Sequence, residues 1–392
     1  MKVLIIGGQF HNKGAYLMVV TVIRKLRSLI EDCEIVMSNY LPLPAELAKE
    51  DIKLLKKPLV HVGYEHKQLK RYLQLAPLVN VYKGFPKGDV ALEDIDVVID
   101  IAGFAYGDLW GINPVKNLNY VLSEVMPKEV TYICLPQAFG PFEKDGMRSE
   151  MAKVIARADL IFARDKVSRA HLTEIAGEHS EKIKQAPDIT LSFNDGNLNG
   201  NTTENYCCIV PNERMLDKGD ASWQDHYLDL LEQIVKQVGN TDTLVKLLVH
   251  DSTSGDGKLA KALHERVASD YCQLIEVQDP LSIKKLIAKG KFLIGSRFHS
   301  LASALSCNVP SLAMGWSHKY QMLFEEYGQA GYAFDKPEKT AILEKAAKLQ
   351  DEQTNKQIRQ ELASKNEVIS EKNQQMWQAV VEEVNKKISQ VV

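Results

Sequence analysis

Three basic residues, Arg297, His299 and Lys319, follow two successive apolar runs of the chain. The first run, Phe292–Ile294, stops at a Gly-Ser pair, and a helical pattern of apolar residues begins directly after it. The second run, Val309–Met314, leads into the segment that contains Lys319. Because the carboxyl ends of parallel strands meet at one edge of a sheet, the spacing predicts that these cations lie close together.

This group of side chains has the chemistry to hold an anion and to move a proton. Arginine binds a carboxylate or a phosphate through two parallel hydrogen bonds, and imidazole exchanges protons near neutral pH. Ser300 stands at the predicted helix start, where a hydroxyl can donate to the same anion. We therefore expect an anionic substrate, with His299 as the candidate general acid and base.

The segment also resembles a known motif. Gly295-Ser296-Arg297-x-His299-Ser300, followed by Pro310 and Lys319, resembles the C-terminal motif of the polysaccharide pyruvyl transferases. Further matches follow the order of that family along most of the chain: Gly7-Gly8, Asn12-Lys13-Gly14-Ala15, Leu135 to Pro141, Ala163-Arg164-Asp165 with Ser168, and Pro187-Asp188.

The resemblance implies transfer of a pyruvyl group from phosphoenolpyruvate to two hydroxyls of a sugar, which gives a cyclic ketal. His299 and Lys319 stand where the family has its reactive histidine and lysine. Arg297, Arg164 and Lys319 are then candidates for holding the donor and neutralising charge as phosphate leaves, which makes Arg297 catalytic together with His299. Phosphoenolpyruvate is a co-substrate, and neither a cofactor nor a metal is expected.

Two positions are assigned to the sugar acceptor. The resemblance implies that the loop from Gln9 to Asn12 touches the acceptor, although Ala15 stands where many members of the family carry aspartate. Gln137 comes just after the predicted strand Val130–Leu135, where its amide is placed to bind a sugar hydroxyl.

Arg164 has two interpretations. It follows the predicted strand Leu160–Ala163, and the residues alone favour an ion pair with Asp165 or a helix-capping contact. The family match favours a contact with the acidic donor instead.

Three other segments that could carry functional side chains follow predicted strands. Phe104 and Tyr106 can form a wall for a sugar ring or simply pack in the interior. His250-Asp251 can orient a sugar, but a capping aspartate before Ser252 is the simpler interpretation. The segment from Ser254 to Lys258 fails the pattern of a phosphate loop, and we interpret it as a solvated turn.

The chain of 392 residues is long enough for two domains. The best boundary is the stretch Phe193–Glu204, which is rich in Asn, Gly, Thr and Asp. We expect an α/β domain over 1–195 on the acceptor side, a second over 205–365 on the donor side, and a C-terminal helix over 366–392 that packs back on the first. The fold class is α/β, with two doubly wound parallel sheets facing across a cleft, the GT-B-like architecture that the resemblance also implies.

Composition excludes several classes of function. The chain carries 48 Lys and Arg against 51 Asp and Glu, so no global field favours nucleic acid. No apolar run approaches the length of a membrane span, and we expect a cytoplasmic protein. The partners expected are phosphoenolpyruvate and a sugar, or a glycan linked to a lipid or nucleotide. A homo-oligomer is compatible with the sequence but not indicated by it.

Two alternatives remain at this point. A metal-independent glycosyltransferase that uses a nucleotide sugar would suit the same fold and the same cations. A noncatalytic member of a polysaccharide-assembly complex would predict a degraded motif, whereas the Arg, His and Lys residues of the motif are all present.

Overall fold

The computed structural model divides into two compact units. Unit 1 comprises Met1–Gln9, Met18–Ile189 and Lys372–Val392, and unit 2 comprises Phe10–Leu17 and Thr190–Glu371. The structure describes residues 1–38, 43–56, 88–127, 129–193, 203–253 and 255–391. Most of the expected interdomain stretch, residues 194–202, lies outside these ranges.

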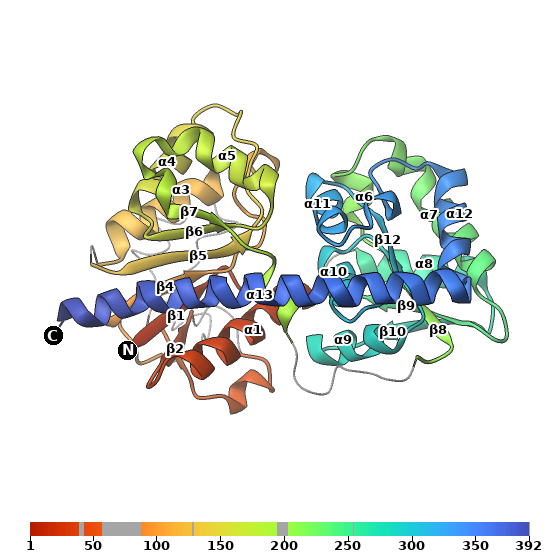
Figure 1. The fold of residues 1–392 in the computed structure, drawn as a ribbon, viewed down its shortest axis with the longest axis horizontal. Coiled ribbons are helices and arrows are strands. Elements are labelled where there is room, and N and C mark those ends of the chain that lie inside the picture. Colours follow the sequence, from red (N-terminus) through yellow and green to blue (C-terminus); the bar gives the residue numbers. More distant parts are fainter. Residues whose placement is uncertain (39–42, 57–87, 128, 194–202, 254, 392) are drawn as a thin grey trace, which may run out of the picture. The chain divides into compact units, whose positions relative to one another are not determined.

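Unit 1 is built on a parallel sheet that has seven strands among the described residues, in the order β3-β2-β1-β4-β5-β6-β7 (Figure 1). The strands are β1 (Lys2–Ile6), β2 (Glu34–Met37), β3 (Ile52–Leu54), β4 (Val97–Asp100), β5 (Thr131–Gln137), β6 (Leu160–Ala163) and β7 (Ile183–Gln185). The helices are α1 (Lys13–Leu29), α3 (Asn113–Tyr120), α4 (Met147–Arg157) and α5 (Lys166–Ala176). Strand and helix alternate along the chain, which is how parallel neighbours are connected.

The central strands of unit 1 are apolar runs because both faces of a parallel sheet are covered. Every residue of β4, β5 and β6 is buried. The strand β5 continues through Pro136, and its pairing with β6 shifts register between Cys134 and Gln137. A proline cannot donate to the ladder, so an irregularity at this point is expected. The strand thus ends two residues later than the sequence pattern predicts.

Unit 2 repeats the architecture with a parallel sheet of six described strands, in the order β10-β9-β8-β11-β12-β13. These are β8 (Tyr206–Val210), β9 (Leu244–Val249), β10 (Cys272–Glu276), β11 (Leu293–Gly295), β12 (Ser311–Met314) and β13 (Ala333–Phe334). The helices are α6 (Arg214–Asp217), α7 (Ser222–Val238), α8 (Asp256–Val267), α9 (Pro280–Lys289), α10 (Phe298–Ser306), α11 (His318–Glu326), α12 (Lys339–Gln350) and α13 (Glu352–Val391).

The chain passes between the units in places that the expected boundaries do not include. Phe10–Leu17 groups with unit 2, although the sequence-based division puts it inside the first domain. The helix α13 begins in unit 2 and contributes its last residues, from Lys372 on, to unit 1. Among the described residues, none of the helices is both long enough and apolar enough to cross a membrane.

Candidate functional site

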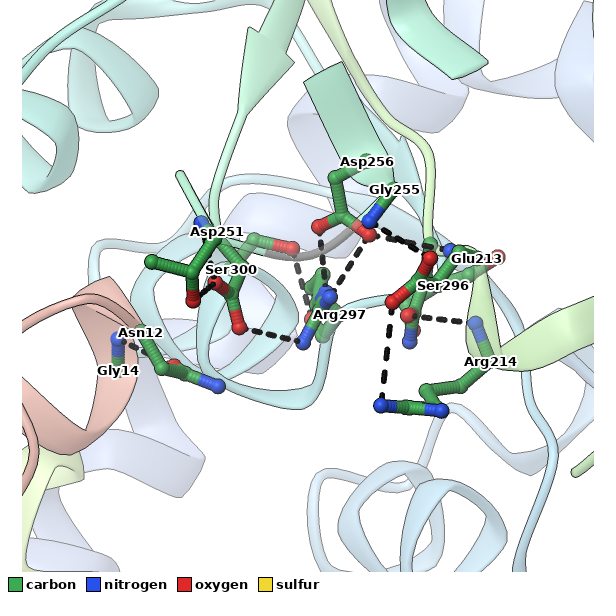
Figure 2. A network of polar contacts seen from close by, with 12 residues as sticks. Asn12, Gly14, Glu213, Arg214, Asp251, Gly255, Asp256, Ser296, Arg297 and Ser300 are labelled. Carbon is green, nitrogen blue, oxygen red and sulfur yellow. Dashed lines mark hydrogen bonds and ion pairs between the residues drawn. The ribbon is translucent and has the colours of Figure 1, made fainter. Parts of the chain in front are cut away.

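Arg297 is the N-cap residue of α10 and lies directly after β11 in unit 2. Its Nε and Nη2 atoms donate to the two oxygens of Asp256 at 2.6 and 2.7 Å, and its Nη1 atom lies 3.5 Å from Asp251 Oδ2 (Figure 2). Burial lowers the pKa of Arg297, but the charge and hydrogen bonds of Asp256 more than offset this, so the pKa is raised. The guanidinium therefore stays charged and is held by protein carboxylates.

Asp256 is a buried anchor, which corrects the sequence-based interpretation of this segment as a solvated turn. It is the first residue of α8 and is fully buried. Besides Arg297, its carboxylate accepts a hydrogen bond from the backbone N–H of Glu213 at 3.0 Å. A buried carboxylate is retained only when such partners satisfy it. The local sequence has turn composition, and only the tertiary partner decides that it is buried.

The turn between β11 and α10 is fixed by side chains from three other elements. Tyr227 donates its hydroxyl hydrogen to Ser296 Oγ at 2.8 Å, while Asn212 Nδ2 and Tyr320 Oη donate to the Ser296 carbonyl at 2.6 and 2.7 Å. The Ser300 hydroxyl donates to the Arg297 carbonyl at 2.7 Å and is fully buried. Ser300 was predicted to bind the donor substrate. Its hydroxyl hydrogen is instead donated to the N-cap residue of its own helix, which stabilises the same turn.

His299, the second residue of α10, packs between an aromatic ring and a glycine. Its ring meets Phe298 edge to face, with 5.2 Å between the ring centroids. A Cβ atom on Gly14 would lie 2.2 Å from His299 Nδ1 and 2.3 Å from Cγ. No side chain fits at that distance, so glycine at position 14 is what lets the start of α1 approach the imidazole.

The loop before α1 lies along the segment after β9, and both belong to unit 2. Asn12 pairs with Asp251 in an antiparallel bridge, and the Lys13 N–H donates to the His250 carbonyl at 3.1 Å. Asn12 Oδ1 accepts from the N–H groups of Gly14 and Ala15 at 3.0 and 3.3 Å (Figure 2). The Asn12 side chain therefore caps the N-terminus of α1, and its contact with the acceptor stays a prediction.

Lys319 is the second residue of α11, and its side chain lies near three aromatic rings. Its Nζ atom lies 4.2 Å from the centroid of the Trp316 ring, 5.5 Å from that of Tyr320 and 5.8 Å from that of Phe298. Ring faces attract a cation in this geometry. β11 and β12 pair side by side, and the Phe298 ring lies within 6 Å of both the His299 ring and Lys319 Nζ, so both predicted residues approach the same aromatic side chain.

Two basic residues of this region were not among the predicted site residues. Lys13 is 3% exposed, and burial lowers the pKa of its ammonium although Asp251 and Asp279 act in the opposite direction. His250 is also 3% exposed; burial, followed by the positive charges of Arg297, His299 and Lys13, holds its pKa well below the ordinary value. The sequence signals available were the position of Lys13 at a helix start and of His250 at a strand end.

Arg164 belongs to unit 1 and has a partner that the sequence analysis did not name. Its Nη1 atom donates to Asp188 Oδ2 at 2.9 Å, and both side chains are buried. Asp165 instead caps α5, where it accepts from the N–H and hydroxyl of Ser168. Arg164 thus forms an ion pair with Asp188, an aspartate of a later segment.

Gln137 and Tyr106 are both interior residues. Gln137 is 0% exposed, and its amide nitrogen bonds the Cys134 thiol within β5. The strand continues to Gln137 and buries it, while its Oε1 atom has no hydrogen-bond partner among the described residues, and the contact with a sugar hydroxyl stays a prediction. Tyr106 is buried and donates to Asp100 Oδ2 at 2.6 Å, as Tyr132 does at 2.8 Å, so packing rather than a sugar wall describes it.

Comparison with known families agrees with the order of these segments. The family model of polysaccharide pyruvyl transferases matches residues 12–318, which is most of the chain. The chain belongs to this family. The match runs from Asn12 to the residue before Lys319 and includes Arg164, Arg297 and His299. Among the described residues, no group of three or more His, Cys, Asp or Glu side chains is arranged to hold a metal ion.

Solved structures identify the fold of this pyruvyl transferase family member as GT-B-like. A UDP complex of Staphylococcus aureus MnaA is 14% identical, with a TM-score of 0.57, and the match covers 91% of this chain and 90% of that one. A putative UDP-N-acetylglucosamine 2-epimerase from Listeria monocytogenes is 14% identical, with a TM-score of 0.57, and the match covers 92% of this chain and 90% of that one. The UDP-GlcNAc 2-epimerase of Neisseria meningitidis is 13% identical, with a TM-score of 0.53, and the match covers 95% of this chain and 99% of that one. At this identity the likeness concerns the fold alone.

Proposed function

We propose that this protein transfers a pyruvyl group from phosphoenolpyruvate to a sugar and forms a pyruvate ketal in the biosynthesis of a cell-surface polysaccharide or exopolysaccharide. The observation that carries the proposal is that His299 and Lys319 stand at the starts of two helices that follow neighbouring parallel strands, and that both approach the Phe298 ring. Family membership supports the reaction type and a sugar acceptor.

The reaction requires a proton and two oxygen–carbon bonds. A proton goes to the methylene carbon of the donor, one sugar hydroxyl adds to the neighbouring carbon, the phosphate leaves, and the second hydroxyl closes the ring. The hydroxyls together lose two protons, of which one balances the new methyl group and the other leaves on phosphate. His299 moves these protons, because an imidazole serves as acid and base in turn.

The anionic groups of the donor need cations that do not move. Lys319 is the proposed contact in unit 2, since its ammonium lies among aromatic rings that hold a cation near His299's helix. Arg164 is retained as a candidate for binding the acidic donor. Arg297 is better described as a positioning residue, because Asp256 takes two of its donors and the pair fixes the turn that carries His299.

The test is phosphate release and mass gain with phosphoenolpyruvate and a panel of free, nucleotide-linked and lipid-linked hexose and N-acetylhexosamine acceptors. Wild type is compared with His299→Ala and with His226→Ala, an exposed histidine of α7. A pyruvyl mass increment that His299→Ala abolishes and His226→Ala keeps is the expected result.

Two outcomes would count against the proposal. An active His299→Ala would remove the proton-transfer assignment. Thermal stabilisation by a nucleotide sugar, with neither stabilisation nor turnover by phosphoenolpyruvate, would identify a glycosyltransferase instead.

A further inference from the structure

Two buried basic side chains, Lys13 and His250, lie beside His299 and have no role in the proposal above. The Lys13 N–H donates to the His250 carbonyl at 3.1 Å, and the adjacent Gly14 contacts the imidazole of His299. The charges that act on His250 are those of Arg297, His299 and Lys13, so all of these side chains are in electrostatic reach of its ring. They form one cluster within unit 2.

The polar atoms of this pair are not satisfied by the described protein. His250 Nδ1 is buried and has no hydrogen-bond partner. In the part of the chain that the structure describes, no hydrogen bond or ion pair of the Lys13 ammonium occurs, although the residue is 97% removed from solvent. Buried donors and acceptors are nearly always bonded in native proteins. The buried His250 Nδ1, within electrostatic reach of a lysine that has no protein partner among the described residues, indicates a place where a ligand supplies the partner.

The charges of the cluster select the chemistry of that ligand. Its three carboxylates already have partners. Asp251 and Asp256 are engaged by Arg297, at 3.5 Å and through two hydrogen bonds respectively, and Asp279, which acts on Lys13, accepts from the Ser282 N–H at 2.8 Å. Burial and neighbouring positive charges hold the pKa of His250 well below its ordinary value, so the ring is neutral and offers one N–H. The groups left over are an ammonium and an imidazole, which together suit an oxyanion and disfavour a cation.

We infer that Lys13 and His250 form an oxyanion-binding pair beside His299, which takes a phosphate or carboxylate group of the substrate. On the proposed function, on which the assignment of the ligand rests, this oxyanion belongs to phosphoenolpyruvate. Lys13 supplies charge and His250 supplies a directed N–H donor. Gly14 lets the helix start that carries Lys13 come close enough to His299 for the bound group to meet the proton-transfer residue.

The first experiment measures calorimetric binding of inorganic phosphate and, separately, of phosphoenolpyruvate to the full chain. Lys13→Met keeps the length of the side chain and removes its charge, and Lys261→Met does the same at an exposed site on α8. We expect Lys13→Met to reduce the affinity for both anions by about tenfold or more, because one charge-assisted hydrogen bond is lost. Lys261→Met should bind like wild type.

The second experiment separates a donor at His250 from a packing role. His250→Asn keeps an N–H donor near the position of Nδ1, whereas His250→Leu fills the same space without one. We expect the asparagine variant to retain most of the affinity and the leucine variant to lose it, with both melting close to wild type. Equal affinity in the two variants would overturn the role of His250.

The results also separate this inference from the proposed function. If wild type forms a ketal and Lys13→Met binds both anions unchanged, the oxyanion pair is wrong and the reaction stands. The opposite result is that wild type binds phosphate, Lys13→Met does not bind phosphate, and wild type neither binds nor consumes phosphoenolpyruvate. In that case the oxyanion pair is supported and the proposed reaction is wrong.

Discussion

Each of the two units buries an arginine directly after a strand and pairs it with an aspartate. In unit 1 Arg164 follows β6 and binds Asp188, and in unit 2 Arg297 follows β11 and binds Asp256. The two arginines looked alike in the sequence, where both are cations at strand ends. Their surroundings differ, because only around Arg297 do the described contacts include further buried basic groups.

The excess of bases over acids is what separates the regions. A buried arginine with one well-placed aspartate is a balanced pair, and such pairs also occur for structural reasons. Lys13, His250 and His299 add basic groups to the pair in unit 2, where Asp251 and Asp279 are further carboxylates, so basic side chains still outnumber acidic ones among these residues. The following changes test whether the two regions differ as described.

The largest effects should come from removing the aspartate of each pair. Asp256→Ala removes the carboxylate that accepts two hydrogen bonds from the buried Arg297, which we expect to cost about 3–5 kcal/mol of unfolding free energy in unit 2. Asp188→Ala should do the same to Arg164 in unit 1. Hydrogen exchange with mass spectrometry checks this, since each variant should raise exchange mainly in the strands of its own unit. Raised exchange in both units from either variant would contradict separate roles.

Gly14→Ala should disable His299 while the chain stays folded. The added methyl group would lie 2.2 Å from the imidazole Nδ1, so the ring must move. A displacement of about 1 Å at a catalytic group costs roughly 100-fold in rate. Gly257→Ala is the matched control, because its Cβ would meet no atom nearer than 3.8 Å and it lies within α8. Turnover with phosphoenolpyruvate and melting temperature are measured for both, and a fully active Gly14→Ala would break the link between α1 and His299.

The affinity for phosphoenolpyruvate should fall as pH rises above about 8, where phosphate ionisation is complete. Burial lowers the pKa of Lys13, so its ammonium loses its proton below the ordinary value of about 10.4, and the affinity falls with it until the loss equals that of Lys13→Met. The charged groups that act within this cluster are Asp251, Asp279, Arg297, His250 and His299. Lys13→Arg keeps its charge and should flatten the profile.

Folding stability should respond to the same titration with the opposite sign. The unfolded chain holds the Lys13 proton to a higher pH than the folded one, so this group stabilises the fold as pH rises through the lowered pKa. A loss of affinity that parallels a loss of melting temperature would therefore argue against Lys13 as its cause.

The smallest effect should come from the rings around Lys319. Trp316→Leu removes the nearest aromatic face, at 4.2 Å, and we expect KM for phosphoenolpyruvate to rise by a few fold, because a cation–π contact contributes about 0.5–2 kcal/mol. Trp316→Phe keeps a ring and should stay close to wild type. Identical KM values in both variants would show that the ring does not position Lys319.

Much of the fold could be predicted from local patterns. The predicted strand Leu160–Ala163 has the predicted bounds, and the apolar runs Phe292–Ile294 and Val309–Met314 become strands whose bounds differ by one or two residues. This works because side-chain periodicity and turn residues act over a few neighbours. The placement of His299 and Lys319 follows from the same rules, since adjacent parallel strands end at one edge.

Tertiary structure alone decided which polar groups are buried and what they bind. The sequence does not show that Arg297 pairs with Asp256, that Gln137 lies inside a continuing strand, or that Lys13 is removed from solvent against His250. These contacts join segments far apart in the chain, and their free energies depend on desolvation and on partners that packing brings together. The types of residue at the site are thus local information, whereas their charge state and availability belong to the folded protein.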